Sequence, residues 1–445
     1  MQLGQTIVSV ITGNADGAVA VLRVSGPQAW ASVNSLSHKN IMEQKGYSLV
    51  FTTLGKPQVI DEALLSLFKA PKSYTGEDVV EISIHASQYI LNKLLEALLA
   101  HGCKLAEPGE FTMRAYLNGK LDLAQAEAVA DIIASESEAE HQMAFNQLKG
   151  QVSNELKSLR EEITNFAALI ELELDFGEED VEFASRERLT ASIDEMSAKV
   201  EQMASSFGHG NAIKNGVPVA ILGMPNAGKS TLLNQLLQDD RAIVSNIEGT
   251  TRDTIEETIN IGGMRFRFID TAGIRQTDNE IEIIGIERSL KAAQKASVVI
   301  YLYDPKHQSQ EELSEALVQI KDNTNGEIWT VANKTDVSPS HHHSHLSISA
   351  INGDIQTLNT QLEQLSQTLT AKLRNTTISN HRHHQALLQA LQYLQDSKQA
   401  IISGMGGELL SLHLREAMRA LGSIVGEIDN EEVLGAIFSK FCIGK

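Results

Sequence analysis

Apolar residues recur along this chain with two different periods, and each period predicts a different kind of structure. Residues 19–24 and 78–85 carry continuous or alternating apolar runs that predict β-strands, whereas residues 89–99 have the spacing of a helix. We therefore expect an α+β domain over residues 1–118. From Leu121 onward the apolar positions follow helical spacing, which marks the start of a different domain.

The helical part contains two seams of apolar residues. Steps of three and four residues predict one long bundle helix with the buried positions Leu148, Val152, Leu156, Leu159, Ile163, Phe166 and Ile170. A second seam near the C-terminus consists of Leu414, Met418, Leu421, Val425 and Ile428. Because the residues between the seams follow another pattern, we expect one helical bundle, residues 119–212 and 373–445, interrupted by an inserted domain at 213–372.

The inserted domain begins with a motif for binding phosphates. Residues 223–230 read Gly-Met-Pro-Asn-Ala-Gly-Lys-Ser, which fits G-x-x-x-x-G-K-[ST]. An apolar run at 217–222 predicts a strand before the motif, and residues 230–237 predict a helix after it. Lys229 is expected to reach the β- and γ-phosphates, and the Ser230 hydroxyl to bind Mg²⁺. The expected nucleotide contacts here are Asn226, Ala227, Gly228, Lys229, Ser230 and Thr231.

A second motif, Asp-Thr-Ala-Gly, follows a predicted strand at 264–269. At the end of that strand a carboxylate can hold Mg²⁺ through water, and the backbone N–H of the glycine can meet the γ-phosphate. The expected contacts are Asp270, Thr271, Ala272 and Gly273.

A third motif, Asn-Lys-Thr-Asp at 333–336, follows an apolar run at 328–332. Its carboxylate suits the paired N1–H and N2–H₂ donors of guanine, which adenine does not offer, so the motif selects GTP through charge-assisted hydrogen bonds. Expected guanine contacts are Asn333, Lys334, Asp336, Ser349 and Ala350. The motifs together predict a Ras-like GTPase domain with a mostly parallel sheet and helices on both faces, within a multidomain α/β protein.

Two features of this domain differ from small signalling GTPases. Ile274 occupies the position where those enzymes carry a Gln that orients the attacking water, so the downstream acidic residues Glu280 and Glu282 are the nearest replacements. Asn226 lies inside the phosphate loop, where its side-chain carbonyl can bind a monovalent cation that supplies positive charge to the transition state. The alternative for Asn226 is a turn-forming residue.

Composition limits the compartment and the partners. The chain of 445 residues has room for about three domains and contains no apolar run long enough for a transmembrane helix. Its two cysteines, Cys103 and Cys442, are too few for a disulfide framework, so we expect a cytoplasmic protein without membrane contact. Because acidic residues outnumber basic ones by 57 to 37, any RNA must meet a local basic patch or be held by a partner.

Several segments resemble the bacterial tRNA modification GTPase family MnmE, also called TrmE, over essentially the full length. They are Tyr-Thr-Gly-Glu-Asp at 74–78, Glu-Pro-Gly-Glu-Phe-Thr at 107–112, Leu-Asn-Gly-Lys-Leu-Asp-Leu-Ala-Gln-Ala-Glu at 117–127, Asp-Phe-Gly-Glu-Glu-Asp at 175–180, Gly-Thr-Thr-Arg-Asp at 249–253 and Phe-Cys-Ile-Gly-Lys at 441–445. Since most of these segments lie outside the GTPase domain, the resemblance is not to GTPases in general.

The resemblance implies a reaction and a set of partners. It implies that the wobble uridine of certain tRNAs is modified at C5 to an aminomethyl or carboxymethylaminomethyl group, as in 5-carboxymethylaminomethyluridine. The implied partner is an FAD-dependent protein of the MnmG (GidA) type that forms a heterotetramer with a homodimer of this chain. The N-terminal domain is implied to dimerise and to bind 5-formyltetrahydrofolate or a related folate.

The resemblance also implies roles for single residues. Folate is expected at Arg23, Glu81, Lys120 and Lys445. GTP is expected to contact Ser245, Asn246, Ile247, Glu248, Gly249, Thr250 and Thr251. K⁺ is expected at Asn226, Ser245, Ile247 and Thr250, and Mg²⁺ at Ser230 and Thr251. Glu282 is implied to orient the hydrolytic water.

Cys442 is implied to take part in the modification chemistry, and the apolar pattern of residues 433–442 predicts that it lies in a helix. The alternative is a buried structural cysteine. Two loops, at 13–17 and 86–87, depart from the family pattern near the expected folate pocket. A regulatory GTPase switch that binds RNA without modifying it, for example in ribosome assembly, is the alternative function, but it has no need of the terminal Cys-Ile-Gly-Lys segment or of a folate domain.

Overall fold

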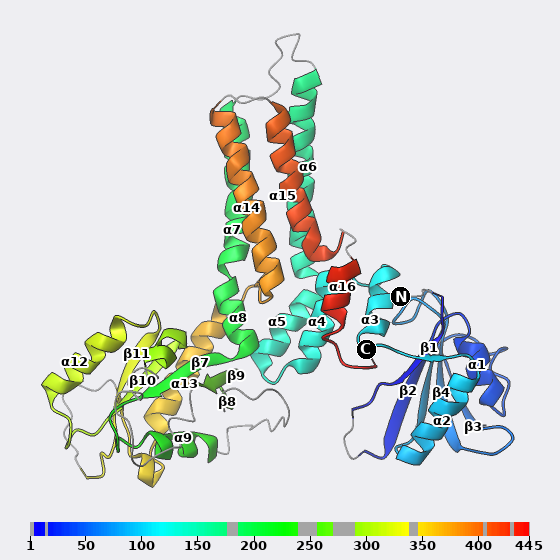
Figure 1. Ribbon diagram of the computed structural model, residues 1–445, viewed down its shortest axis with the longest axis horizontal. Helices are drawn as coiled ribbons and strands as arrows, with labels where there is room; N and C mark the ends of the chain where they lie inside the picture. Colours follow the sequence, from blue (N-terminus) through cyan, green and yellow to red (C-terminus); the bar gives the residue numbers. More distant parts are fainter. Residues whose placement is uncertain are drawn as a thin grey trace. The chain divides into compact units, whose positions relative to one another are not determined.

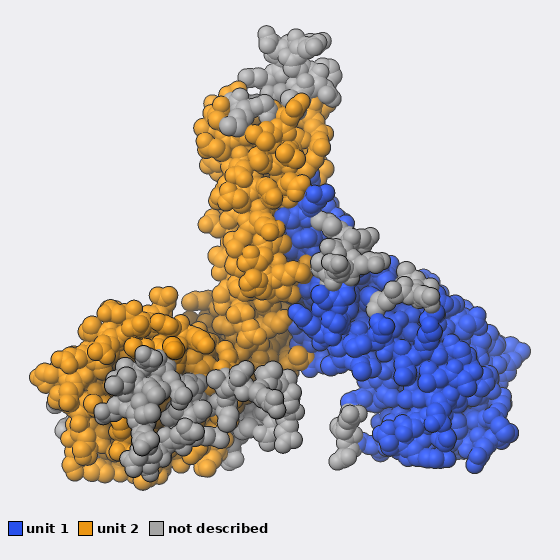
Figure 2. All heavy atoms as spheres, viewed as in Figure 1, with its two compact units in different colours: residues 1–133, 147–161, 418–445 blue, residues 134–146, 162–417 orange. Residues whose placement is uncertain are grey.

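The computed structural model describes residues 4–13, 17–175, 186–238, 256–269, 290–337, 346–403, 407–427 and 431–444. The chain divides into two compact units, which Figure 2 shows in different colours. The first unit comprises residues 1–133, 147–161 and 418–445, and the second comprises residues 134–146 and 162–417. Each unit is built around its own six-stranded sheet.

The sheet of the first unit has the order β3-β4-β5-β2-β1-β6 and is antiparallel except where β6 pairs with β1. The predicted strands at 19–24 and 78–85 and the predicted helix at 89–99 are confirmed as β2, β5 and α2. The strands are β1 Ile7–Val10, β2 Val19–Ser25, β3 Ser48–Leu54, β4 Asp61–Phe68, β5 Val79–His85 and β6 Lys104–Leu105. The helices beside them are α1 Ala29–Leu36 and α2 Gln88–Ala100.

Alternation along the strands decides which side chains enter the core of this unit. In β2 the residues Ala20, Leu22 and Val24 are buried, and they pack with Trp30 of α1 and Leu98 of α2. Because successive side chains of a strand point to opposite faces, the residues between them lie on the other face of the sheet. That second face carries the charged side chains considered below.

Three short helices complete the first unit: α3 Glu110–Leu117, α4 Leu123–Ala134 and α16 Glu431–Phe438. Met113, Leu123 and Ala126 form a small apolar cluster with Phe438 and Phe441 near the end of the chain. The C-terminal segment is thus packed against helices from the first third of the sequence.

The sheet of the second unit has the order β12-β11-β10-β7-β9-β8, with all neighbours parallel except the β8–β9 hairpin. The predicted strands at 217–222, 264–269 and 328–332 are confirmed as β7, β9 and β11. The strands are β7 Val217–Leu222, β8 Glu257–Ile261, β9 Met264–Phe268, β10 Val298–Tyr303, β11 Glu327–Ala332 and β12 Leu346–Ser347.

Helices cover both faces of this sheet, as the sequence predicts. Val219 and Ile221 of β7 belong to the apolar cluster that includes α9 Lys229–Gln238 and α13 Gln356–Ala371. The alternate residue Ala220 belongs to the opposite cluster, with α12 Gln310–Lys321. The predicted mostly parallel, three-layer architecture is therefore confirmed.

The bundle seen in Figure 1 is formed by the long helices α6 Gln151–Asp175, α7 Arg186–Ser205, α14 His381–Ile402 and α15 Gly407–Val425. Two shorter helices, α5 Glu138–Leu148 and α8 Phe207–Asn215, precede α6 and follow α7 along the chain. Helices α7 and α14 run side by side along most of their length. No helix among the described residues is long and apolar enough to cross a membrane.

The predicted seam of the first long helix is confirmed except at Leu148, and the seam of α15 is partly wrong. Six of the predicted positions lie in α6 and are fully or almost fully buried: Val152, Leu156, Leu159, Ile163, Phe166 and Ile170. Leu148 ends α5 and is only half-buried. In α15 the predicted positions Leu414 and Leu421 are buried, as are Leu410, Ala417 and Ile424, whereas Met418 and Val425 are half-buried. The small Ala417 is buried in place of Met418, the next residue, which the pattern of large apolar residues indicates. Ile428 lies outside the described residues.

The β8–β9 hairpin is held to the start of α5 within the second unit. Arg265 pairs with Glu136 (Nη1 to Oε2, 3.0 Å) and with Glu140 (Nε to Oε1, 2.9 Å). Its Nη2 also donates to the carbonyl of Lys214 at 2.8 Å, at the end of α8. The backbone N–H of Ala139 donates to the carbonyl oxygen of Gly263 at 3.1 Å. The hairpin is thus attached to a helix that lies distant in sequence.

Candidate functional site

The predicted phosphate loop lies between β7 and α9, and two of its glycines are required by close packing. A Cβ on Gly223 would lie 2.0 Å from the carbonyl oxygen of Leu302, and one on Gly228 would lie 2.3 Å from Nδ2 of Asn333. Both glycines also adopt positive φ, at 146° and 99°. Asn226 adopts φ 62° and is exposed, so its backbone fits the turn-forming alternative while its side chain stays accessible to a ligand.

Lys229 starts α9 and closes the loop. Its Nζ donates to the carbonyls of Gly223 at 2.8 Å and Met224 at 2.9 Å, and burial lowers the pKa of its ammonium group. Ser230 and Thr231 follow in the first turn of the same helix. Backbone N–H groups and a lysine at the start of a helix form an environment that favours phosphate.

The predicted guanine loops are joined to the phosphate loop by one buried amide. Asn333 is 3% exposed; its Nδ2 donates to the carbonyl of Ala227 at 2.8 Å, and its Oδ1 accepts from the N–H of Ala350 at 3.0 Å. The hydroxyl of Ser349 donates to Oδ1 of Asp336 at 2.7 Å. Three predicted segments that are distant in sequence therefore lie together at the carboxyl ends of parallel strands.

Asp304, which directly follows β10, supports these loops and was not predicted. Burial raises the pKa of Asp304, but hydrogen bonds from Lys334 (2.8 Å), the backbone N–H of Lys306 and the His307 ring outweigh it and lower the pKa to about 2. Lys334, which has φ 61°, is fixed by this ion pair. The signal available in the sequence was a lone aspartate at the end of a fully apolar strand.

Part of the predicted nucleotide site lies outside the described residues. This applies to Ser245, Asn246, Ile247, Glu248, Gly249, Thr250, Thr251, Asp270, Thr271, Ala272, Gly273 and Glu282. Their assignments stay predictions. Over the described part of the chain there is no group of three or more His, Cys, Asp or Glu side chains able to hold a metal ion.

In the first unit, strand register brings two predicted folate residues together. Arg23 of β2 is paired with Glu81 of β5, and Nη2 of Arg23 lies 2.9 Å from Oε1 of Glu81. The guanidinium group stacks over the ring of Tyr74 at 4.9 Å and over that of Phe111 at 5.5 Å. Burial raises the pKa of Tyr74, whose hydroxyl is 2.8 Å from that of Thr112. We name Arg23, Glu81, Tyr74 and Phe111 the Arg23 cluster; the sequence reasoning missed its two aromatic members.

The other carboxylates near Glu81 have different partners. Oε1 of Glu77 lies 3.1 Å from Nη1 of the buried Arg114, and Asp78 pairs with Lys69 at 3.2 Å. Glu81 is therefore the carboxylate that faces Arg23. Nζ of Lys120, a further predicted folate residue, donates to the carbonyl of Pro71 at 3.2 Å, and Lys445 lies outside the described residues.

The prediction that Cys442 lies in a helix is wrong. Helix α16 ends at Phe438, where the chain turns back so that Phe438 and Phe441 both join the apolar cluster of α3 and α4. Cys442 is exposed, which also excludes the alternative of a buried structural cysteine. The tail is held through its backbone, since the carbonyl of Cys442 accepts from the N–H of Gly109 at 3.4 Å.

The tail then reaches the strand next to the Arg23 cluster. A Cβ on Gly444, which has φ 99°, would lie 2.4 Å from the carbonyl oxygen of Val10, the last residue of β1. Val10 is paired with Leu22, the neighbour of Arg23 in β2. An exposed thiol and the Arg23 cluster, from opposite ends of the sequence, are thus part of the same unit.

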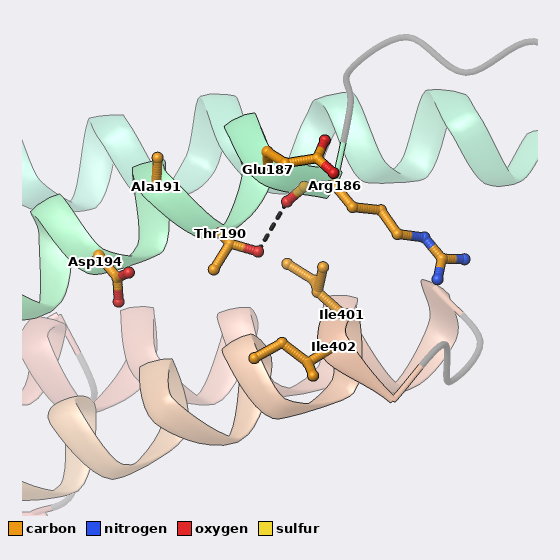
Figure 3. Close-up of a pocket in the computed structure, with 7 residues that line it drawn as sticks. All are labelled: Arg186, Glu187, Thr190, Ala191, Asp194, Ile401 and Ile402. Atoms are coloured by element: carbon orange, nitrogen blue, oxygen red, sulfur yellow. Dashed lines mark hydrogen bonds between the residues drawn. The ribbon is translucent and has the colours of Figure 1, made fainter.

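A cavity of about 460 Å³ between α7 and α14 contains none of the predicted residues. Figure 3 shows Arg186, Thr190 and Asp194 of α7 facing Ile401 and Ile402 of α14. The Thr190 hydroxyl donates to the carbonyl of Arg186, and Asp194 pairs with Lys398. Because Thr190 and Asp194 have partners within the bundle, we do not assign a ligand to this cavity.

Comparison with known proteins agrees with this architecture. Residues 6–120 match the family described as GTP-binding protein TrmE N-terminus, and residues 123–442 match the MnmE helical domain. The tRNA modification GTPase MnmE of Christiangramia forsetii is 44% identical over 474 residues, with 100% of both chains covered. That of Flavobacterium johnsoniae is 45% identical over 467 residues, with 99% of both chains covered.

Among solved structures, a complex of Era with MgGDPNP and a segment of 16S ribosomal RNA covers 40% of this chain and 66% of that one, at 25% identity and a TM-score of 0.25. The assignment rests on the full-length relatives and on the matched domains. The chain belongs to the MnmE (TrmE) family of tRNA modification GTPases.

Proposed function

We propose that this chain is a K⁺-stimulated GTPase that, with an FAD-dependent partner of the MnmG (GidA) type, modifies C5 of the wobble uridine of certain tRNAs. The product is an aminomethyl or carboxymethylaminomethyl group. The observation that carries the proposal is the full-length similarity to tRNA modification GTPases, in a chain whose exposed Cys442 and Arg23 cluster belong to one unit.

In the nucleotide site, Asp336 accepts from guanine while Ser349 holds one of its oxygens. Asn333 keeps the guanine loops at a fixed distance from the phosphate loop, so base and phosphates are recognised as one ligand. Nζ of Lys229 donates to two backbone carbonyls in this structure. When GTP binds, it donates to phosphate oxygens instead. Glu282 orients the hydrolytic water, since Ile274 cannot do so by hydrogen bonding.

The cation sites are proposed from the chemistry of their donors. Ser230 and Thr251 offer hydroxyl oxygens, which suit Mg²⁺. Asn226, exposed in the phosphate loop, offers an amide oxygen for K⁺ together with Ser245, Ile247 and Thr250. Bound K⁺ supplies positive charge near the phosphates during hydrolysis. Equal GTP hydrolysis rates in K⁺ and Na⁺ would count against this cation site.

The Arg23 cluster suits a folate. Tyr74 and Phe111 provide aromatic faces for a flat ring, and the Arg23–Glu81 pair offers hydrogen-bond donors and acceptors beside them. Lys120 and Lys445 are proposed to bind the acidic glutamyl tail. The proposed ligand is 5-formyltetrahydrofolate or a related folate. We propose that the chain binds it as a homodimer. This homodimer forms a heterotetramer with the FAD-dependent partner in the cytoplasm.

Replacing Cys442 by Ser tests whether the thiol is used in the chemistry. Because the side chain is exposed and the tail is held by backbone contacts, Cys442→Ser should leave folding and GTP hydrolysis near wild type. If the thiol is reactive in the modification, the variant should not restore the modified uridine in a deletion strain, as measured by mass spectrometry of tRNA nucleosides. Lys440→Ser, also exposed and on the same tail, is the matched control.

A return of the modified uridine to wild-type levels with Cys442→Ser would exclude a role for the thiol. If tRNA from the deletion strain itself keeps the modification, the proposed function is wrong and a regulatory GTPase switch becomes the better description.

A further inference from the structure

Two long stretches of this chain contain no acidic residue. Neither residues 202–238 nor residues 364–395 include an Asp or Glu, although acidic residues occupy 57 of 445 positions, or about one in eight. The chain as a whole carries a formal net charge of −20, which repels any polyanion. The surface formed by these stretches therefore has no acidic side chain of its own to repel a polyanion.

The two stretches lie against each other in the second unit. The N–H of Ile378 donates to Oγ of Ser206 at 3.0 Å, and Nε2 of His209 is 2.8 Å from the carbonyl of Leu369. The backbones are so close that a Cβ on Gly210 would lie 2.2 Å from the carbonyl oxygen of Ile378. Helix α8 and the linker between α13 and α14 thus lie in direct contact; Figure 1 shows the ribbon of these elements.

This surface carries fixed positive charge. Lys372 and Arg374 lie in the linker and are exposed. Lys372 directly follows α13, which carries the carbonyl of Leu369 that lies 2.8 Å from Nε2 of His209. Burial, together with the charge of Lys372, lowers the pKa of the His209 imidazole, although its bond to Leu369 raises it. The positive charge of this surface is therefore supplied by Lys372 and Arg374.

Aromatic rings lie beside these charges. Phe207 stacks on His384 with a centroid distance of 4.2 Å and an interplanar angle of 6°. The ring of His381 meets Phe207 edge-on at 5.9 Å and is exposed. Aromatic faces next to basic side chains are the usual elements of a surface that binds single-stranded nucleic acid, because bases stack on the rings while phosphates meet the cations.

We propose that this surface binds the RNA backbone of the tRNA substrate, which deepens the proposed function and rests on it. We name it the acid-free surface and define it by Phe207, His209, Lys372, Arg374, His381 and His384. Lys372 and Arg374 contact phosphates, and His381 stacks on an unpaired base. RNA fits better than a protein partner because the surface combines exposed cations with an exposed aromatic ring.

The test is the binding of fluorescein-labelled unfractionated tRNA to the full-length protein over a series of salt concentrations. Lys372→Glu combined with Arg374→Glu should weaken binding by about tenfold or more and reduce the slope of log K against log[salt] by roughly 1.5, as expected for two lost phosphate contacts. His381→Ala should weaken binding by about fivefold with an unchanged slope, because stacking does not release counterions.

The matched control is Lys295→Glu combined with Lys321→Glu. Both lysines are exposed and lie outside the two acid-free stretches, and the change in net charge is the same. This control should bind tRNA as the wild type does. GTP hydrolysis without RNA should be unchanged in every variant, since none of the altered residues belongs to the nucleotide site.

Unchanged tRNA affinity in the Lys372/Arg374 variant would overturn the proposal, as would an equal loss in the control or no measurable binding by the wild type. A DNA duplex that binds as tightly as tRNA, with the same dependence on Lys372 and Arg374, would overturn the assignment to RNA. The proposed function fails separately: in that case the deletion strain keeps its modified uridine while the acid-free surface still binds tRNA.

Discussion

The nucleotide loops of the second unit are assembled from short motifs that each follow a strand, whereas the Arg23 cluster of the first unit is assembled across strands. In the former, Asn333 connects Ala227 to Ala350 through contacts at the ends of parallel strands. In the latter, Arg23 meets Glu81 because β2 and β5 pair in one register, and the aromatic rings come from a loop and a helix. A motif therefore locates the first site, but the second depends on the register of a whole sheet.

This difference has a consequence for mutation. In the nucleotide site one buried side chain holds several backbone segments, so its loss affects the whole ligand. In the Arg23 cluster the backbone is already fixed by the antiparallel ladder, so the loss of one side chain removes only that side chain's own contacts. The four predictions that follow test this contrast, from the largest expected effect to the smallest.

The largest effect is expected for Glu282→Ala. If this carboxylate orients the attacking water, turnover should fall on the order of 10²–10⁴-fold while GTP affinity stays near wild type. Single-turnover hydrolysis and calorimetric GTP binding measure the two quantities, and Glu280→Ala is the neighbouring control. A loss of turnover below about threefold would mean that another group orients the water.

Asn333→Ala should affect binding rather than turnover. It leaves the carbonyl of Ala227 and the N–H of Ala350 buried without their present partner, at a cost of about 1–3 kcal/mol for each group. We expect GTP affinity to fall by roughly 10²-fold by calorimetry. Asn323→Ala, in the loop that follows α12, is the control and should bind GTP normally. Normal affinity in Asn333→Ala would show that the loops hold their positions without this amide.

Asp304→Asn should remove an acid-dependent part of the stability of the second unit. The pKa of Asp304 is lowered from 3.8 to about 2 in the fold, so its ionised form stabilises the protein above pH 3.8, and this contribution is lost as the pH falls toward 2. The contribution near neutral pH is about 2 kcal/mol. Because Trp329 is buried in β11, its fluorescence in a Trp30→Phe background reports urea unfolding of this unit.

The free energy of unfolding of the wild type should decline between pH 4 and pH 2 by about 2 kcal/mol more than that of Asp304→Asn. Asp322→Asn, an exposed change at the end of α12, is the control and should follow the wild type. Parallel pH profiles for wild type and Asp304→Asn would contradict the role of the Lys334 ion pair.

The smallest effect is expected for Arg23→Lys. Lysine keeps the charge but loses the planar group that pairs with Glu81 and stacks on Tyr74. Binding of 5-formyltetrahydrofolate should weaken by about tenfold, with GTP affinity unchanged. Lys39→Arg, exposed in the same unit, should have no effect on either ligand. Unchanged folate affinity in Arg23→Lys would remove this cluster from the proposed pocket.

The sequence predicts much of the fold because apolar periodicity is a local property. Strand β7, helix α9 and the seam of α6 follow directly from it, and the phosphate and guanine motifs locate Gly228, Lys229 and Asn333. The pattern fails where size and hydrophobicity disagree with packing: in α15 the small Ala417 is buried while the larger Met418 is half-exposed.

The unpredicted parts of the sites depend on contacts between distant segments. No local sequence pattern shows that Asp304 forms an ion pair with Lys334. Nor does any local pattern show that the rings of Tyr74 and Phe111 lie against Arg23. The helix predicted at 433–442 ends at Phe438, although Phe438 and Phe441 belong to one apolar cluster. Because residues three apart lie on the same face of a helix, the spacing of these two rings fits a continued helix equally well and does not show where the helix ends.

The attachment of Arg265 to α5 has a mechanical consequence. The sheet of the second unit is joined to long helices by the chain itself on either side of it, at α8 and after α13. These two covalent connections alone would still allow the sheet to rotate about the line that joins them. The ion pairs from Arg265 to Glu136 and Glu140 provide a third point of attachment. The position of the sheet against α5 is thus set by contacts of Arg265 and by the backbone bond between Ala139 and Gly263, as well as by the covalent connections on either side of the sheet.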